Sequence, residues 1–597
     1  MRRCTLALGL SISLSAAAQT STAPTHLSLS APASATRTFQ PTELSLTSDG
    51  IFANPYDPAQ ADLQVSFTSP AGKVMTVPAF WYQDFDRATL RPKGTAGWRV
   101  RFTPTSAGQW TASAAFAKPS LRSALLKFNV AASDAQGFVR IDKQNPRYFS
   151  LDNGASTFYF PIGLNIGWAS EQAGTTGSVL DTYGRWLTQL SKNGGSIARV
   201  WMAPWSFAVE WKDTGLGDYG GRQLQAWLLD QVFEMAREKG VNIELTLINH
   251  GQFSSSTNDE WKDNPFNVVN GGFLNSPDEF ATNPQARALF KRKLRYVAAR
   301  YAAQPNLFAW EWWNEVNWTP IGDGDLKDWI REMTGALKTW DPYDHLISSS
   351  YSTGGTSDLW KLPQIDFSQQ HDYSARDPLV WGRRNVSSFT DTAPNKPVLL
   401  AEVGYSAGGT EPPLIRDQIH FHNSIWAAPF VGYAGSGMYW WWDTFVDPQN
   451  QWPQYKGLAD FLKGENLASM TGQNASATSL NAAALTLKSK NRALIWLRSS
   501  AYDAGEANAA YTKALGQQKG GPHWNYVLPM HYKGTVKVDG LSDGAYTAYW
   551  YAPQKNIWLS VVPVTVKGNS VTLSAPAFDK DLAVKLVPAG ETRTPSP

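Results

Sequence analysis

The sequence predicts an α/β protein in which a (β/α)8 barrel is flanked by two β-sandwich domains. Three observations support this fold class. The chain has 597 residues, which suffices for roughly two to four domains of ordinary size. Its middle section alternates short apolar runs with amphipathic stretches, as βαβ units do. Its two outer sections contain short alternating runs separated by Gly, Pro and Asp, as β-sandwiches do.

The composition is that of a soluble globular protein with several cores, since 43% of its residues are hydrophobic and 17% are charged. The net charge of +3 arises from 53 basic and 50 acidic residues. This balance lacks the basic excess of a nucleic-acid binder, so we expect no nucleic-acid partner. No later run approaches the roughly 18 apolar residues of a membrane helix, so we expect no membrane insertion. The oligomeric state is left open.

Residues 1–18 have the pattern of a secretory signal peptide. Arg2 and Arg3 precede an apolar run at 4–14, and small residues follow at 16–18. We therefore expect a secreted or periplasmic protein. Cys4 is the only cysteine and would leave with this segment, so the mature chain would have no disulfide and no cysteine metal site.

The two outer sections are predicted to be the sandwich domains, at 27–132 and 475–590. Alternating polar and apolar residues indicate strands in both sections. The predicted strands lie at 62–68, 98–103, 125–130, 493–497, 534–538, 545–551, 570–573 and 582–586. Neither section shows catalytic groups, so we expect both domains to pack against the barrel.

The middle section, 138–468, is predicted to be the (β/α)8 barrel. The clearest helices are at 222–239 and 284–303, and the loop at 250–283 is long enough to be functional. Eight apolar runs are assigned as parallel strands, at 159–165, 197–202, 242–248, 307–314, 346–350, 367–372, 397–403 and 437–442.

Aromatic residues are unusually abundant, with 27 Trp, 22 Tyr and 27 Phe. Sugar rings stack on aromatic faces, and Trp offers the largest face with a donor at its edge. Clusters such as Trp440, Trp441 and Trp442 favour a carbohydrate ligand over a purely structural role. For any single Trp, burial in a core is the alternative.

Two glutamates lie at the predicted carboxyl ends of barrel strands. Glu315 follows the fourth strand in LFAWEWWNE, and Glu402 follows four apolar residues and an Ala in PVLLAEV. The fourth and seventh strands face each other across the barrel, so the two carboxylates can flank one bond. This pairing predicts glycoside hydrolysis, in which one carboxylate attacks the sugar and the other protonates the leaving oxygen. Glu311 lies on the same face of this strand as Glu315, one side-chain layer deeper, so we expect it to be a hydrogen-bond partner inside the barrel.

The WWNE ending at Glu315, the isolated Glu402 and the Trp-rich eighth strand resemble clan A glycoside hydrolases, which include family 5 cellulases and mannanases. The resemblance implies a retaining (β/α)8-barrel enzyme with Glu315 as acid/base, Glu402 as nucleophile and Asn314 on the sugar 2-hydroxyl. The outer sections resemble the sandwich domains of some secreted bacterial glycosidases. No metal or cofactor is implied.

Further residues match the sugar-binding positions of this family. Arg199 resembles the arginine that keeps the nucleophile ionised, although an ion pair with Glu311 is the alternative. His371 and Tyr373 resemble a His-x-Tyr pair, with a satisfied core histidine as the alternative for His371. The other matches are His250, with a plain loop residue as the alternative, Trp440 as the platform beneath the reacting sugar, Trp442 on the same strand face, and Trp168.

The resulting hypothesis is a secreted retaining β-glycosidase that acts on a poly- or oligosaccharide. A catalytically inactive carbohydrate-binding protein and a transglycosidase on the same scaffold are the alternatives. The presence of Glu315, Glu402 and Arg199 argues against the first alternative, whereas a transglycosidase uses the same residues. The sugar, its linkage and exo or endo action are left open.

Overall fold

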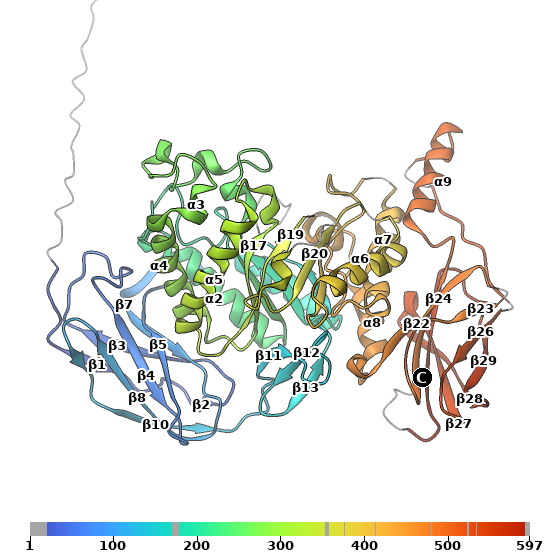
Figure 1. Ribbon diagram of the computed structural model, residues 1–597, viewed down its shortest axis with the longest axis horizontal. Coiled ribbons are helices and arrows are strands. Elements are labelled where there is room, and N and C mark those ends of the chain that lie inside the picture. The colour runs from blue at the N-terminus through green and yellow to red at the C-terminus, as the bar shows by residue number, and fades with distance from the viewer. Residues whose placement is uncertain are drawn as a thin grey trace, which may run out of the picture.

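The computed structural model describes residues 21–169, 178–352, 358–374, 376–411, 413–478, 480–521, 524–532 and 534–591. The expected signal peptide at 1–18 lies outside these residues. Three parts lie in a row: the N-terminal sheets, a central α/β part and the C-terminal sheets (Figure 1). One apolar core runs through the first two parts and reaches the larger sheet of the C-terminal part, and a separate core lies within the C-terminal part.

Two sheets, built almost wholly of antiparallel pairs, form the N-terminal part. They pack face to face, with the rings of Phe67 and Phe102 stacked at 3.9 Å between them. The first sheet contains, in order, β1 (Leu27–Leu29), β3 (Thr42–Ser48), β7 (Pro92–Phe102) and β6 (Phe80–Phe85). The second contains β2 (Thr36–Arg37), β10 (Leu126–Ala131), β8 (Gly108–Phe116), β4 (Leu63–Thr68) and β5 (Val74–Pro78), with β9 (Leu121–Arg122) paired to β8.

Parallel strands form the central barrel. Tyr439 bridges both β14 and β21 and so closes the ring. The strands are β14 (Gly163–Asn165), β15 (Ile197–Trp201), β16 (Asn242–Asn249), β17 (Leu307–Asn314), β18 (Leu346–Ser348) with β19 (Ser350–Tyr351), β20 (Ser368–Asp372) and β21 (Val398–Val403). Every residue of β15, β16, β17, β20 and β21 is buried, because helices cover the outside and side chains fill the inside.

The predicted eighth strand, 437–442, is wrong in extent. Only Tyr439 forms β-bridges, although Met438 and Trp440 also hydrogen-bond to the backbone of β21, and Trp442 begins a five-residue π-helical turn, Trp442–Val446. The apolar run resembled a strand because Trp440, Trp441 and Trp442 all have high strand propensity. Their side chains instead serve separate contacts at the barrel mouth.

Amphipathic helices surround the barrel, and sequence signals fix several of their ends. Asn283 caps α4 by accepting from the backbone of Gln285 and Ala286, and Pro284 occupies the first turn. The helices are α1 (Val179–Lys192), α2 (Gln223–Glu238), α3 (Glu279–Thr282), α4 (Pro284–Tyr301), α5 (Asp323–Trp340), α6 (Pro378–Thr392), α7 (Leu414–Val431) and α8 (Pro453–Leu462).

A small antiparallel sheet precedes the barrel strands and covers its amino-terminal end. It contains β11 (Phe138–Ile141), β12 (Phe149–Asp152) and β13 (Ser156–Tyr159). Phe149 packs against Phe308 at the start of β17 and Phe367 before β20, with ring centroids 5.0 and 5.6 Å apart. The end opposite the predicted glutamates is therefore sealed.

The C-terminal part contains two further antiparallel sheets. Helix α9 (Ala504–Gly516) is inserted between β25 and β26 and projects beside α7 (Figure 1). The larger sheet contains β22 (Thr471–Asn474), β24 (Ala482–Ser489), β25 (Arg492–Ser499), β30 (Asp581–Pro588), β27 (Gly544–Ala552) and β28 (Ile557–Val566). The smaller contains β23 (Ser476–Thr478), β26 (Gly534–Asp539) and β29 (Ser570–Ala575).

Buried ion pairs join the outer parts to the barrel. Arg101 of β7 donates to Asp230 of α2 at 2.7 Å, which also accepts from Arg300 of α4. On the other side, Nε2 of His422 in α7 lies 2.7 Å from an oxygen of Asp581 in β30. Because breaking a buried pair is costly, these contacts fix the outer parts against the barrel.

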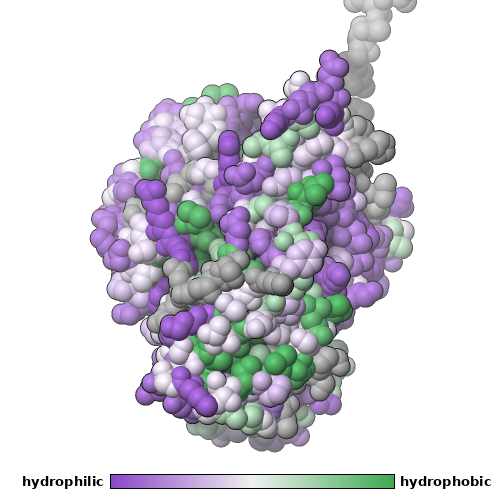
Figure 2. All heavy atoms as spheres, turned by 90° about the vertical axis from the view of Figure 1, so that its right-hand side faces the viewer, coloured by the Kyte–Doolittle hydropathy of each residue, from purple (hydrophilic) through white to green (hydrophobic). Residues whose placement is uncertain are grey.

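The surface of the C-terminal part carries apolar side chains on one side. Figure 2 views the molecule from the side of the C-terminal part, and the apolar side chains gather in the lower half of this view. Edge strand β28 contributes four exposed apolar side chains: Ile557, Leu559, Val561 and Val562. Pro563 in the same strand removes a donor from this edge and so disfavours pairing with another strand. No helix of the described ranges combines the length and apolarity that a membrane span requires.

Candidate active site

Glu315 stands at the carboxyl end of β17, where the strand turns sharply. Its φ of 48° lies in the left-handed region, which is uncommon for a residue other than glycine. Its backbone N–H donates to the hydroxyl of Ser350 on the neighbouring strand β19 at 3.0 Å. Such strained positions often occur at functional sites. The turn and the cross-strand bond together hold the Glu315 carboxyl at the barrel mouth.

Glu402 lies near the end of β21, and a donor contacts each of its oxygens. Arg199 donates from Nη1 to Oε1 at 2.6 Å, and the hydroxyl of Tyr373 donates to Oε2 at 2.7 Å. The ladder between β20 and β21 shifts register between Gln370 and His371, which re-aims the last residues of β20. The Glu402 carboxylate is thus fully oriented without any ligand.

The two glutamates lie close together, with His371 between them. One oxygen of Glu315, one of Glu402 and one ring nitrogen of His371 all lie within 4.8 Å of one another. Nδ1 of His371 is 3.0 Å from Oε1 of Glu315 and 3.4 Å from Oε2 of Glu402. These three side chains could also hold a cation, but Arg199 already places a positive charge on Glu402. The expectation of no metal stays a prediction.

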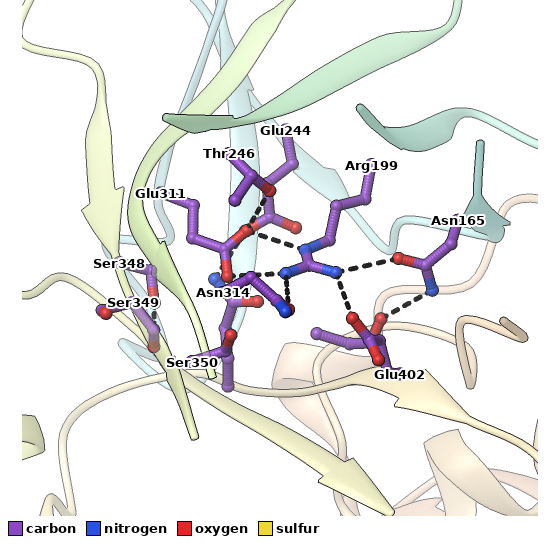
Figure 3. Close-up of polar contacts among 12 residues, drawn as sticks. Asn165, Arg199, Glu244, Thr246, Glu311, Asn314, Ser348, Ser349, Ser350 and Glu402 are labelled. Atoms are coloured by element: carbon purple, nitrogen blue, oxygen red, sulfur yellow. Dashed lines mark hydrogen bonds and ion pairs between the residues drawn. The ribbon is translucent and has the colours of Figure 1, made fainter. Parts of the chain in front are cut away.

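Arg199 connects the two halves of the site through one guanidinium (Figure 3). Its Nε and Nη2 donate to the two oxygens of Glu311 at 2.7 and 2.8 Å. Nη2 also donates to Oδ1 of Asn314 at 2.7 Å, and Nη1 donates to Oδ1 of Asn165 at 3.1 Å as well as to Glu402. The two roles considered for Arg199 are therefore combined, because it pairs with Glu311 and with Glu402 at once.

A second buried carboxyl lies in the layer beneath Arg199. Glu244 accepts from the amide of Gln369 at 2.7 Å, and burial together with the charge of Glu311 raises the pKa of Glu244 well above its ordinary value. The neutral form of Glu244 is therefore favoured more than that of an ordinary glutamate.

Burial controls the ionisation of the groups at the mouth. It raises the pKa of Glu315, against the lowering effects of His250 and Arg199. Burial also raises the pKa of Glu402, and the charge of Arg199 and the hydrogen bond from Tyr373 oppose this rise. Burial lowers the pKa of His371 to about 4, so this histidine is neutral at physiological pH.

Asn314 and His250 form the wall next to Glu315. The amide nitrogen of Asn314 is 3.1 Å from Nδ1 of His250, and its oxygen accepts from Arg199. Nε2 of His250 lies 3.3 Å from the amide of Asn258 in the long loop after β16. His250 is thus part of the site's hydrogen-bond network rather than a plain loop residue.

Four tryptophans form a wall beside the carboxylates. The half-buried Trp440 lies 5.7 Å from Trp168 and 5.1 Å from Trp201, centroid to centroid. The guanidinium of Arg199 lies 5.3 Å from the Trp201 ring. This arrangement leaves Trp440 as the platform candidate, next to the residues that hold Glu402. The fourth member, Trp205, packs on Trp168 and is more exposed.

The expectation that Trp442 contacts a sugar is wrong in the structure described. Trp442 is only 1% exposed, and its ring packs edge to face behind Trp168 and Trp440 at 5.1 Å from each. Trp442 begins the π-helical turn instead of lying on a strand, so its side chain lies behind the tryptophan wall. Trp442 supports the two rings that can face a ligand.

Trp440→Ala is expected to weaken catalysis on glycosides without unfolding the protein. The loss should be about 1 to 3 kcal/mol in kcat/KM, because a large aromatic surface no longer covers the sugar. Steady-state kinetics on an aryl glycoside, with thermal melting as a folding check, measure this. Unchanged kinetics would assign the platform to another ring.

Three residues of the site were not identified from the sequence. Asn165 holds Arg199 and donates to the backbone oxygens of Ala401 and Met438 at 2.9 and 3.1 Å. As a polar residue at the end of a barrel strand, it carried the same signal as Glu315. Trp201 also ends a strand, and Trp318, which is 41% exposed, follows Glu315 by three residues and hydrogen-bonds to it.

Comparison with known proteins places this site in context. The probable mannan endo-1,4-β-mannosidase F of Neosartorya fischeri is 24% identical over 257 residues, which cover 39% of this chain and 53% of that protein. Mannan endo-1,4-β-mannosidase 2 of Arabidopsis thaliana is 32% identical over 224 residues, 30% of this chain and 50% of that protein. The resemblance to glycoside hydrolases is confirmed. The chain spans about half the length of these relatives.

The fold has a solved counterpart along nearly its whole length. The crystal structure of a candidate glycoside hydrolase from Bacteroides vulgatus superposes with a TM-score of 0.60 at 15% identity, covering 92% of this chain and 99% of that one. Residues 35–117, in the N-terminal sheets, match a domain of unknown function, DUF5060. The N-terminal part therefore belongs to a recurring module, and the bacterial origin expected from the sequence stays a prediction.

Proposed function

We propose that this chain is a retaining β-glycosidase, in which Glu402 is the nucleophile and Glu315 the acid/base. One observation carries the proposal: an oxygen of Glu315 lies within 4.8 Å of an oxygen of Glu402. Retaining enzymes place their carboxyl groups about 5 to 5.5 Å apart, whereas inverting enzymes need about 6.5 to 9.5 Å to admit a water. The spacing fits the retaining class and is shorter than the separation that inverting enzymes need.

In the first step, an oxygen of Glu402 attacks the anomeric carbon while the bond to the leaving oxygen breaks. Glu315 donates its proton to that leaving oxygen. In the second step, Glu315 takes a proton from water, the water oxygen attacks the anomeric carbon, and the bond to Glu402 breaks. Both carboxyl groups return to their starting states, and the anomeric configuration is retained.

The surrounding contacts suit these roles. Arg199 and Tyr373 hold the Glu402 carboxylate in one orientation, which aligns it for attack. Neutral His371 lies against both carboxyls, and Asn314 is fixed by Arg199 and His250 so that one amide hydrogen can serve the sugar. Trp440 supplies the face on which the reacting sugar lies.

The first substrate class to test is β-1,4-mannan, because the curated relatives are named for its cleavage. Purified protein would be incubated with β-mannan, cellulose, xylan and galactan, and with aryl β-glycosides of the same sugars. Release of reducing ends from any of them supports a glycosidase. Binding without release would favour an inactive carbohydrate-binding protein, and products longer than the substrate would favour a transglycosidase.

The pH profile of kcat/KM should be a bell whose limbs belong to different glutamates. Activity falls at low pH as Glu402 is protonated, and at high pH as Glu315 loses its proton. The contact from Tyr373 lowers the pKa of Glu402, so Tyr373→Phe should move the acidic limb to higher pH. Movement of the alkaline limb alone would contradict the assignment of Glu402.

The proposal includes the wider architecture. A closed (β/α)8 barrel flanked by two β-sandwich domains fits the paired sheets on either side of the parallel strands. Secretion to the outside or the periplasm rests on the signal pattern at 1–18. Mass spectrometry of the protein recovered from a secreting host checks this, because cleavage after residue 18 leaves Gln19 at the amino terminus.

A further inference from the structure

A second pocket lies outside the catalytic residues, between two loops at the barrel mouth. It has a volume of about 290 Å³ and is lined by Pro204, Trp205, Trp211, Glu260 and Asp263. The first three residues follow β15, and the last two belong to the long loop after β16. A pocket of this size lies near the lower end of the range for ligand sites, about 300 Å³.

The pocket adjoins the aromatic wall of the active site. Trp205 packs edge to face against Trp168 at 5.3 Å, and Trp168 packs against Trp440 at 5.7 Å. Trp205 is nonetheless 47% exposed, which leaves a large ring surface open beside the pocket. An exposed aromatic ring that continues a ring series from the reaction centre is suited to a chain of sugar units.

Glu260 gives this pocket a fixed polar group. Oε1 of Glu260 accepts from the amide of Asn249 at the end of β16, at 3.0 Å, and its backbone N–H donates to Gly251. Its Oε2 has no hydrogen-bond partner within the described ranges. This atom is buried, but Glu260 as a whole is partly exposed and lines the pocket, which places its carboxyl group beside a ligand hydroxyl. Burial also raises the pKa of Glu260 to about 7.

At the rim, Asp263 offers a second carboxylate, which Lys212 contacts at 3.0 Å. A sugar ring presents hydroxyls at its edge and an apolar face, and the pocket presents carboxyls beside an aromatic face. The chemistry of the two therefore matches.

We propose that this pocket is a subsite for a sugar unit remote from the reacting one. The face of this sugar lies on Trp205, and its hydroxyls donate to Glu260 and Asp263. This subsite rests on the proposed glycosidase function and extends it. A subsite remote from the reacting sugar gives long substrates a higher kcat/KM than short ones.

The test compares Trp205→Ala with the parent protein on long and short substrates. The long probes are mannohexaose and cellohexaose, and the short probes are the 4-nitrophenyl β-glycosides of mannose and glucose. We expect the loss in kcat/KM on the hexasaccharide to exceed the loss on the aryl glycoside by about tenfold. Trp205→Phe should recover part of the kcat/KM on the hexasaccharide, because it restores an aromatic face. Glu260→Gln in the parent protein should lower kcat/KM on the hexasaccharide relative to the aryl glycoside.

Tyr532→Ala is the matched control, because it removes an aromatic ring that is 70% exposed on the C-terminal part. It should change neither rate. Calorimetry measures the binding of both hexasaccharides to Glu402→Gln, with and without Trp205→Ala, and needs no turnover. The second substitution should weaken binding about tenfold.

Equal losses in kcat/KM on long and short probes would overturn the subsite. So would hexasaccharide binding that is the same with and without Trp205, or that is absent in both proteins. Hydrolysis of the aryl glycosides judges the proposed function separately. A protein that cleaves them but shows no Trp205-dependent preference for length therefore retains the function and loses the subsite.

Discussion

Glu402→Gln should abolish turnover on every glycoside that the parent protein cleaves. The amide keeps the size of the side chain but cannot form the covalent bond to the anomeric carbon, so kcat should fall by about four orders of magnitude or more. Steady-state kinetics on an aryl glycoside measure the loss. Because Arg199 and Tyr373 would still find one acceptor oxygen, a melting curve should show that the variant is folded.

The same position allows a rescue experiment. Glu402→Gly opens space for a small external nucleophile, so azide should restore part of the activity on an activated glycoside. One displacement by azide replaces two by the enzyme, and the product should have inverted configuration. Parental activity in purified Glu402→Gln, without azide, would refute the assignment of the nucleophile.

Glu315→Ala should separate substrates by their leaving groups. An activated aryl glycoside needs little proton donation, so it should still form the glycosyl-enzyme, whereas an unactivated oligosaccharide should lose nearly all reactivity. The alkaline limb of the pH profile should disappear, because the group that must hold a proton is gone. Pre-steady-state release of the aryl group measures the first step directly.

If Glu315→Ala kept the full bell, or lost the first step equally for good and poor leaving groups, Glu315 would not be the acid. Glu311 does not provide an alternative in this structure. It is 0% exposed, and both of its oxygens accept from Arg199, so a substrate cannot reach its carboxyl group.

The sequence predicted the strands that carry the catalytic candidates because their local signals are strong. The run ending at Asn314 matches β17 at both ends, and the predicted strand at 397–403 differs from β21 by one residue. Both are fully buried and carry a polar side chain at or next to their last residue, as barrel strands that reach an active site do. Their pairing across the barrel followed from strand order alone.

Features that depend on tertiary contacts were not predictable in this way. Residues 437–442 have strand-like composition, yet only Tyr439 forms β-bridges, because the chain turns into a π-helical turn at Trp442. Trp442 looked equivalent to Trp440 by alternation, but the π-helical turn buries it. The sharing of Arg199 between Glu311 and Glu402 depends on distances between three strands, β15, β17 and β21, which no single segment encodes.

Some missed features did have local signals. Helix α9 begins with Asp503 as its cap and Glu506 in its first turn, a capping pattern visible in the sequence. Asn165 and Trp201 end barrel strands as the catalytic candidates do. The orientation of Trp205 and Glu260, by contrast, follows from how two loops meet, so the second pocket required the structure.

Trapping the covalent intermediate tests the central claim most directly. The protein would be incubated with 2-deoxy-2-fluoro-β-glycosyl fluorides of the mannosyl and glucosyl series, whose fluorine slows release of the sugar from the enzyme, and its peptides would be analysed by mass spectrometry. The account predicts one fluorosugar attached to the peptide that contains Glu402, and no attachment in Glu402→Gln. Attachment to another residue, or a first product of inverted configuration from the parent protein, would contradict it.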